Sequence, residues 1–327
     1  MIQDRFFRLC TVFLLAAILS INLLSSYIRH HEAGLDCDPW PACYGVIGVP
    51  TAAASAETAI EQALTPAQSA KRAHRAIATA LVVLVLVVTF HARSRLPTAG
   101  SAALLPYLLI AVVLFLSVIG PASYLKTLPA VASANLIGGM VLLALTWILW
   151  LITGQPAAAP PVPLSSTLVR VALAALSVQI ALGSWVSANF AGTACSGWWQ
   201  CQGGAPAGIA GSFWYLRELG VDEGGRVILT QAQQYIHLAH RLFAVVATLL
   251  LGALGITAAR QQGPQFFWGV LLLGILTAQL LLGLTAVFSG LPLIAILAHS
   301  FLASLLLLVM LRLYLLGVPA SQRSASR

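Results

Sequence analysis

Eight long stretches of the chain are almost entirely apolar, and shorter polar segments separate them. Each stretch provides the roughly 20 apolar residues that a helix needs to cross the hydrocarbon core of a bilayer. The pattern therefore predicts an all-α integral membrane protein with eight transmembrane helices. The expected helices cover residues 6–27, 74–92, 102–120, 129–152, 167–188, 236–258, 266–288 and 292–316.

The first apolar stretch also has the basic flank of a signal peptide, because Arg5 and Arg8 lie at its start. It is long for a cleaved segment, and it resembles the fifth stretch. We therefore expect it to remain as a membrane helix.

The composition excludes several classes of protein. Of the 327 residues, 59% are hydrophobic and 8% are charged, and the mean hydropathy is +0.92. These values exclude a water-soluble enzyme, a disordered chain and a collagen-like chain. The net charge of +8 comes from sparse basic residues that flank apolar stretches, as in topogenic signals. We therefore expect the lipid bilayer as a partner and no nucleic acid.

The polar segments on the two sides of the membrane differ in charge. An even number of spans places both termini on one side, where nine basic residues accompany a single acid, Asp4. The other eight acids lie on the opposite side with eight basic residues. The excess of positive charge predicts a plasma-membrane protein with cytoplasmic termini. Since the basic residues are divided almost equally, this orientation also depends on the cysteines.

Four of the five cysteines lie in the two long outer loops, as pairs with the same C-x5-C spacing. An oxidising periplasmic or extracellular compartment would join them as Cys37–Cys43 and Cys195–Cys201. Four cysteines allow three pairings, and the matching spacing favours pairing within each loop. A zinc site is the alternative, although structural zinc sites usually have closer cysteines. Cys10 is interpreted as an apolar residue within the first span.

The sequence contains an internal duplication. Seven residues from the end of the first expected helix and the loop after it recur 158 positions later: Ser26, Ala33, Gly34, Cys37, Trp40, Cys43 and Gly45 match Ser184, Ala191, Gly192, Cys195, Trp198, Cys201 and Gly203. Farther on the shift is 166, and His74-Arg75 matches His240-Arg241. The chain thus divides into residues 1–153 and 167–327, two four-helix units. Prolines in the linker, 154–166, exclude a continuous helix between them.

Polar residues within the spans are candidates for function because they are costly in a bilayer. His74, His240 and His299 qualify, together with Asn135 at the position corresponding to His299. His240 in the first turn of its helix and His299 would lie at similar depth if their helices are neighbours. Two imidazoles without a nearby carboxylate or thiolate suit a heme iron, whose porphyrin supplies the other four nitrogens.

Simpler interpretations of these residues stay open. His240 and His299 would each hydrogen-bond a neighbouring helix, and His237 would be an interfacial residue or a partner of a ligand. Arg75 and Arg241 are placed to bind heme propionates or to reach phospholipid headgroups. The repeated Gln-x3-Gly motif, at 179–183 and 279–283, is interpreted as helix packing.

These motifs together resemble one family. The segment Arg29-x4-Gly34-Leu-x-Cys37-Asp-Pro-Trp40-Pro-Ala-Cys43-x-Gly45, then His74-Arg75, and then a second, weaker copy are similar to the heme A synthase (cytochrome oxidase assembly) family over nearly the whole chain. The resemblance implies two pseudosymmetric four-helix bundles, with heme b in the C-terminal bundle and heme O as substrate in the N-terminal bundle. It also implies oxidation of the C8 methyl of heme O to the formyl group of heme A, with heme supplying the redox chemistry.

Carried over by position, the resemblance makes His240 and His299 the iron ligands of heme b and His74 a ligand of the N-terminal site. The chain departs from the family at two positions. Asn135 replaces the expected partner of His74, and Lys71 occupies the position of a glutamate held to be catalytic in the family. His74 is therefore the candidate catalytic residue that is retained.

Three functions follow as hypotheses. The first is a divergent heme A synthase that supports cytochrome c oxidase, with heme O synthase and terminal oxidase assembly factors as partners and a homo-oligomer as an open alternative. The second is a noncatalytic heme b-binding assembly protein that has lost the N-terminal active site. The third is a transporter built on a repeat, although the broken helices typical of many transporter sites are not evident.

Overall fold

The computed structural model describes residues 2–31, 66–96, 100–120, 127–153, 164–195, 197, 200–201, 208–223 and 227–317. Eight helices in this part of the chain are long and apolar enough to cross a membrane. They are α1 (Ile2–His31), α2 (Pro66–Arg93), α3 (Leu105–Ile119), α4 (Pro129–Thr153), α5 (Ser166–Ala188), α7 (Gln231–Ala259), α8 (Pro264–Phe288) and α9 (Leu293–Gly317). The prediction of an all-α, multi-pass membrane protein is confirmed.

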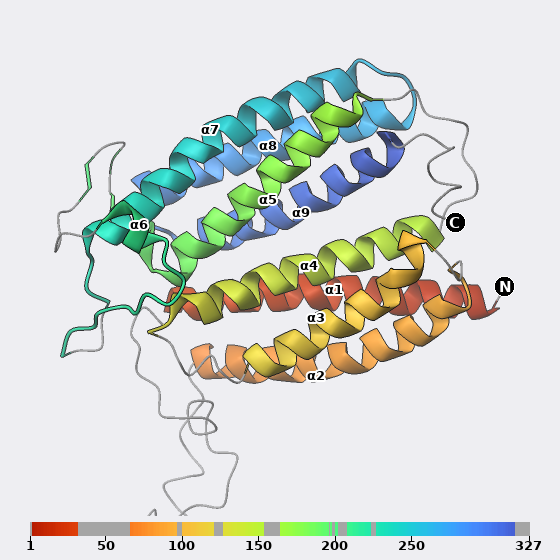
Figure 1. Cartoon of the computed structure of the whole chain (residues 1–327), viewed down its shortest axis with the longest axis horizontal. Helices are drawn as coiled ribbons and strands as arrows, with labels where there is room; N and C mark the ends of the chain where they lie inside the picture. Colours follow the sequence, from red (N-terminus) through yellow and green to blue (C-terminus); the bar gives the residue numbers. More distant parts are fainter. Residues whose placement is uncertain are drawn as a thin grey trace, which may run out of the picture.

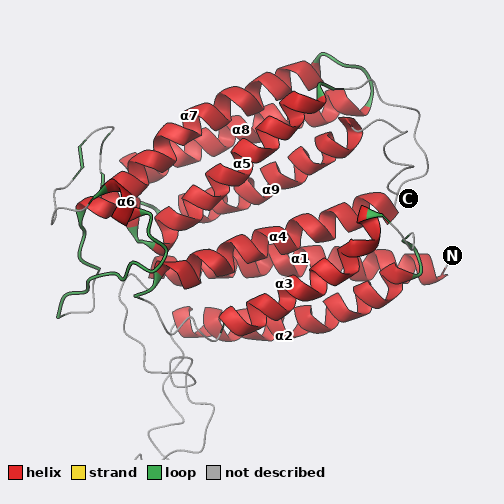
Figure 2. Ribbon diagram, viewed as in Figure 1, coloured by secondary structure: helices red, strands yellow, loops and turns green. Residues whose placement is uncertain are grey.

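The long helices form two groups of four that lie side by side (Figure 1, Figure 2). One group contains α1 to α4, and the other contains α5, α7, α8 and α9. In each group neighbouring helices pack around a square, so that α2 lies diagonally opposite α4 and α7 lies diagonally opposite α9. Each group has its own apolar core: Leu14, Val88 and Leu143 are buried in the first, and Leu254, Leu272 and Met310 in the second.

The interface between the groups has the twofold pseudosymmetry expected of a duplication. Helix α1 packs on α9 as α4 packs on α5, and these two contacts correspond under the repeat. Arg29 and Ser187, which are 158 positions apart, touch directly, with the Arg29 Nε donating to the Ser187 Oγ at 3.0 Å. Residues related by a twofold axis meet each other only near that axis, so this pair marks its position.

Three helices extend at least four residues beyond the predicted apolar stretches. α1 continues to His31, and α2 begins at Pro66, eight residues before His74. α7 begins at Gln231, where Thr230 and Gln233 form a capping box. The prediction that His240 lies in the first turn is wrong, because the helix begins nine residues earlier, at Gln231. The capping box stabilises a polar first turn, which the apolar pattern does not reveal.

α1 begins and α9 ends at the same end of the molecule (Figure 1). The opposite end carries the short helix α6 (Ile209–Ser212) and the loop with Cys195 and Cys201, and we call it the disulfide end. The predicted Cys37–Cys43 bridge and most of the linker, 154–163, lie outside the described residues. Ser165 directly precedes α5, and its side chain accepts a hydrogen bond from the Leu168 backbone.

Close packing of α7 on α8 depends on Gly269. A Cβ atom at Gly269 would meet the backbone nitrogen of Ala259 and would lie 2.8 Å from the carbonyl carbon of Ala258. Backbone atoms cannot move aside as the end of a side chain can.

We therefore expect Gly269→Ala to destabilise the protein by about 1–3 kcal/mol, the usual cost of overpacking. Gly274→Ala in the same helix is the matched control, because a Cβ there meets nothing within 4 Å. Unfolding of both variants in mixed detergent micelles measures the difference. Equal stability of the two variants would show that the α7–α8 contact is not tight at Gly269.

Candidate functional site

His240 on α7 and His299 on α9 face the interior of the second bundle, and both are half-buried. They are close enough for a charge on one ring to act on the other. Their helices are diagonal in the bundle rather than neighbours, which corrects the arrangement assumed from the sequence. The two rings thus approach the bundle interior from opposite sides, with α5 and α8 on the flanks.

The flanking helix α5 supports His240 through both residues of the first Gln-x3-Gly motif. The Gln179 Nε2 lies 3.1 Å from the His240 Nδ1, and it also donates to the His240 carbonyl at 3.2 Å. At Gly183, one turn farther along α5, a Cβ would lie 3.1 Å from the His240 Cε1. Glycine therefore leaves the space that the ring occupies.

The helix α8 supports His299 in the same way. The Gln279 Nε2 lies 3.2 Å from the His299 Nε2, and a Cβ at Gly283 would lie 3.2 Å from the His299 Cε1. The interpretation of the Gln-x3-Gly motif as packing is therefore incomplete. Each copy of the motif holds one histidine ring. The histidines alone do not indicate this role, but the motif recurs in the sequence after 100 residues.

This arrangement fits a heme with two axial imidazoles. The His299 Nδ1 is buried without a hydrogen-bond partner, so this ring has an unused nitrogen in an apolar environment. Within the described residues no group of three or more His, Cys, Asp or Glu side chains could hold a metal ion. Two imidazoles from opposite helices suit a cofactor that brings its own equatorial ligands.

His74 occupies the corresponding place in the first bundle, but its surroundings differ. Its Nε2 forms a 2.9 Å hydrogen bond with the Oγ of Ser25 on α1. Under the repeat, Ser25 corresponds to Gly183 and Ile21 to Gln179. Asn135 is half-buried on α4, diagonally across the bundle from α2. The N-terminal site therefore has one histidine, held by a hydroxyl instead of an amide.

Positive charge gathers near His74. Arg29 and Arg75 both act electrostatically on the ring. Lys71, one turn earlier on α2, is buried with 8% of its surface exposed. The position at which the resemblance expects a glutamate therefore has a buried amine.

Two hydrogen bonds connect the sites across the interface. The Ser26 Oγ lies 2.9 Å from the Ser300 Oγ, and Ser300 directly follows His299. Ser25, the residue before Ser26, contacts His74. The Ser133 Oγ lies 2.7 Å from the Ser184 Oγ, next to Gly183. The first helix of each bundle therefore uses two consecutive residues. Ser25 of α1 and Gly183 of α5 lie against the histidine of their own bundle, and Ser26 and Ser184 contact the other bundle.

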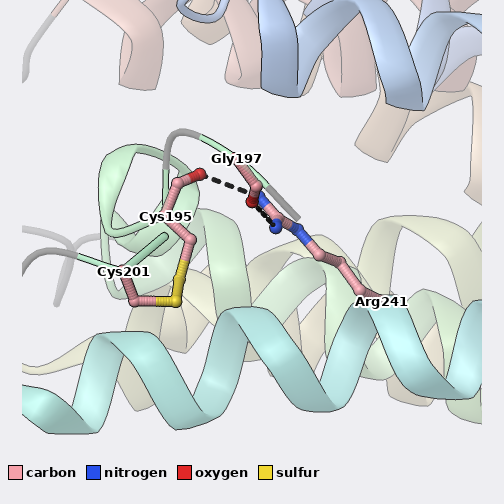
Figure 3. The surroundings of a disulfide bond; sticks show 4 residues. All are labelled: Cys195, Gly197, Cys201 and Arg241. Carbon is pink, nitrogen blue, oxygen red and sulfur yellow. Dashed lines mark hydrogen bonds between the residues drawn. A yellow bond between two sulfur atoms is a disulfide. The ribbon is translucent and has the colours of Figure 1, made fainter. Parts of the chain in front are cut away.

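Arg241 holds the disulfide loop over the end of the bundle (Figure 3). Its Nη1 donates to the Gly197 carbonyl at 2.6 Å, and its Nη2 donates to the Cys195 carbonyl at 2.8 Å. Cys195 and Cys201 are joined by a disulfide, with an S–S distance of 2.07 Å. Because Arg241 directly follows His240, the loop is anchored at the residue next to this histidine.

The remaining histidines have structural contacts. His237 is buried against the Ala191 backbone, beneath the disulfide loop. The His30 Nε2 lies 3.0 Å from the Leu291 carbonyl, so His30 connects the end of α1 with the turn before α9. His31 packs on Tyr27, and His91 donates to the Val87 carbonyl at the other end of α2.

The segment between α6 and α7 also holds a half-buried arginine that the sequence did not mark, Arg217. The guanidinium of Arg217 donates to the Oδ1 of Asn189, the residue that ends α5. Burial lowers the pKa of Arg217 below its usual value. This contact fastens the loop to the top of the second bundle.

Comparison with known proteins gives two matches. A family model described as cytochrome oxidase assembly protein matches residues 8–311. A protein named heme A synthase, from Shewanella oneidensis, is 32% identical over 318 residues, covering 93% of this chain and 93% of that protein.

Arg241→Ala should expose the Cys195–Cys201 bridge to reductant. Hydrogen bonds from a charged donor each contribute on the order of 1.5–3 kcal/mol, so we expect reduction to be about tenfold faster or more. Mass spectrometry of alkylated peptides measures the rate for this bridge alone. Arg170→Ala is the control, because Arg170 donates to Ser166 within its own helix. An unchanged rate would mean that Arg241 does not hold the loop.

Proposed function

The chain belongs to the family of cytochrome oxidase assembly proteins, and from this premise we propose that it is a heme A synthase-type oxidoreductase. The substrate is heme O, and the product is heme A, in which a formyl group replaces the C8 methyl. The product serves cytochrome c oxidase assembly. The observation that carries the proposal is the pair of histidines, His240 and His299, that faces across the second bundle.

In this proposal His240 and His299 would hold heme b. The glycines at 183 and 283 leave room for the two rings, and the glutamines at 179 and 279 restrict their rotation. When bound, heme b supplies electron transfer to the substrate site. The loop that Arg241 fixes is anchored beside His240.

The first bundle receives the substrate. His74 would bind its iron from one side, while Asn135 on the opposite side is a weak ligand beside imidazole. Arg75, at the same position as Arg241 in the repeat, lies at the disulfide end, where a guanidinium can bind a propionate. Arg29 adds positive charge beside His74.

Proton transfer differs from the scheme that the resemblance implies. Lys71 has an amine where the resemblance implies a glutamate, so the carboxylate that would act as general base is missing at this position. His74, held by Ser25 at 2.9 Å, is the titratable group that remains in the described part of the site.

The orientation in the membrane follows from the same proposal. The disulfide end would face the periplasm or the outside of the cell, because a disulfide is stable in an oxidising compartment. The ends of α1 and α9 would lie in the cytoplasm, in accordance with the basic residues on that side.

A second function is a heme b-binding assembly protein without catalysis. Three features of the first bundle favour it: Asn135 in place of a histidine, Lys71 in place of an acid, and the hydrogen bond of Ser25 to the His74 ring nitrogen. Both functions place heme b between His240 and His299, and they differ in what happens in the first bundle.

His299→Ala should abolish the low-spin spectrum of the purified protein, because one axial ligand is lost while the helix stays apolar. Membrane insertion should be unchanged. His91→Ala is the control, since His91 is bonded within its own helix at the other end of α2. Difference spectra of the reduced and oxidised protein measure the effect. An unchanged spectrum in His299→Ala would remove this residue from the ligands.

Coexpression with a heme O synthase, in a host that lacks heme A, separates the two functions. We expect heme A in the extracted pigments, resolved by mass, and its loss in His74→Ala. Heme O alone, together with a stable b-type spectrum, would establish the assembly function instead. A protein that binds no heme would refute both.

A further inference from the structure

A hollow at one end of α2 takes no part in the sites described above. Its volume is about 460 Å³, and the residues that line it are Phe90, His91, Arg93, Ser94 and Arg95. The start of α1 lies beside it, because the ring centroids of Phe6 and His91 are 5.4 Å apart. Figure 1 shows these two helix ends together, opposite the disulfide end of the molecule. We call this hollow the α2 pocket.

Aromatic rings hold the two arginines of the α2 pocket. The guanidinium carbon of Arg95 lies 4.7 Å from the ring centroid of Phe7, a buried residue of α1. The guanidinium carbon of Arg93 lies 5.7 Å from the ring centroid of Tyr107 on α3. Both distances are typical of a cation over an aromatic face. The Arg95 Nη1 also donates to the His91 carbonyl at 2.8 Å. Three helices thus place two positive charges beside the hollow.

The surroundings of the α2 pocket are positively charged. The acidic side chains that the structure describes lie between α6 and α7, at the disulfide end, and are Glu218, Asp222 and Glu223. On the side of the pocket the sequence has nine basic residues and one acid, Asp4. The His91 carbonyl, near the negative end of the α2 dipole, accepts hydrogen bonds from Ser94 and Arg95. The pocket therefore fits an anion.

The rim of the α2 pocket is apolar and exposed. Phe90 is 77% exposed and Phe6 is 47% exposed, and both belong to helices that can cross a membrane. Phe90 precedes Arg93 by about 4.5 Å along the helix, so the ring lies deeper in the bilayer than the charge. Aromatic rings at headgroup level with guanidinium groups just outside them match the two parts of a phospholipid, the acyl chain and the phosphate.

The second bundle has different residues at the corresponding end of α7. With the shift of 166, the residues at the positions of His91, Arg93 and Arg95 are Thr257, Ala259 and Gln261. One arginine is present there, Arg260, which is exposed and corresponds to Ser94. Since both bundles have the same frame, folding of the unit does not require the arginines of the α2 pocket.

We propose that the α2 pocket binds an anionic phospholipid, with its phosphate at Arg93 and Arg95 and an acyl chain along Phe6 and Phe90. Arg93 is exposed, and a guanidinium group donates two parallel hydrogen bonds to the oxygens of a phosphate. Arg95 adds a second charge that is held in place by Phe7. Free phosphate has the same charge chemistry, but it makes no use of the aromatic rim.

Native mass spectrometry of the delipidated full-length protein measures the binding of phosphatidylglycerol. The variants are Arg93→Ala, Arg95→Ala and the double variant. Arg260→Ala is the matched control, because it removes an exposed arginine at the same end of the molecule in the other bundle. Phosphatidylcholine, which has the phosphate but no net charge, tests the need for an anionic lipid. Inorganic phosphate as a competitor tests whether the ligand is a lipid.

We expect wild-type protein and Arg260→Ala to bind phosphatidylglycerol equally well. Each single variant of the pocket should bind it about fivefold more weakly, and the double variant roughly 25-fold, because each arginine near a membrane surface contributes about that factor toward an anionic lipid. Affinities equal to that of Arg260→Ala would overturn the proposal. Equal binding of phosphatidylcholine by wild-type protein would also overturn it. Displacement of the lipid by millimolar inorganic phosphate would assign the pocket to a soluble phosphate instead.

A second variant keeps the test decisive if Arg95→Ala does not fold. Arg93→Glu reverses an exposed charge, and thermal unfolding in detergent verifies that each variant is folded. It should bind phosphatidylglycerol more weakly than Arg93→Ala, because the carboxylate repels the phosphate. Wild-type affinity in Arg93→Glu would overturn the proposal. The result does not depend on heme, because the pocket lies about 25 Å along α2 from His74.

Discussion

Polar side chains within the membrane must find partners inside the protein, and this constraint determines how the two bundles are joined. Lipid tails offer no hydrogen bonds, so a hydroxyl or guanidinium at the interface is stable only against another polar group. Ser26 meets Ser300, Ser133 meets Ser184, and Arg29 meets Ser187. Small residues at these points also let the helices approach closely. The same residues therefore fix both the distance between the bundles and their pseudosymmetry.

The helix α1 has a special position under this constraint. Its consecutive serines face in different directions, Ser25 toward His74 in its own bundle and Ser26 toward Ser300 in the other. A ligand that moves the His74 ring would act on Ser25, and the next residue, Ser26, is hydrogen-bonded to Ser300 beside His299. The sites of the two bundles are thus connected by a short, continuous series of contacts rather than through the loops.

Duplication of one unit explains why the two sites share a frame and differ in chemistry. The second bundle retains two histidines, each with a Gln-x3-Gly motif beside it. In the first bundle the corresponding positions hold Ser25 and Ile21, and the fourth helix carries Asn135. A site with two strong axial ligands suits electron transfer, whereas a site with one strong ligand leaves room for a reaction at the iron or for release of the porphyrin. These requirements conflict in a single site, and two copies allow each to be met separately.

The sequence by itself determined the eight helices, the duplication and the identity of the polar residues within the spans. Apolar length and cost of burial are local properties, so His74, His240 and His299 could be found without a structure. It did not determine the start of α7, because the polar turn at Gln231 adds nothing to an apolar pattern. Only the tertiary structure placed α7 and α9 on a diagonal, with Gln179 and Gln279 against the two rings. That arrangement depends on which faces of the helices pack against each other, and the packing of all eight helices together determines this.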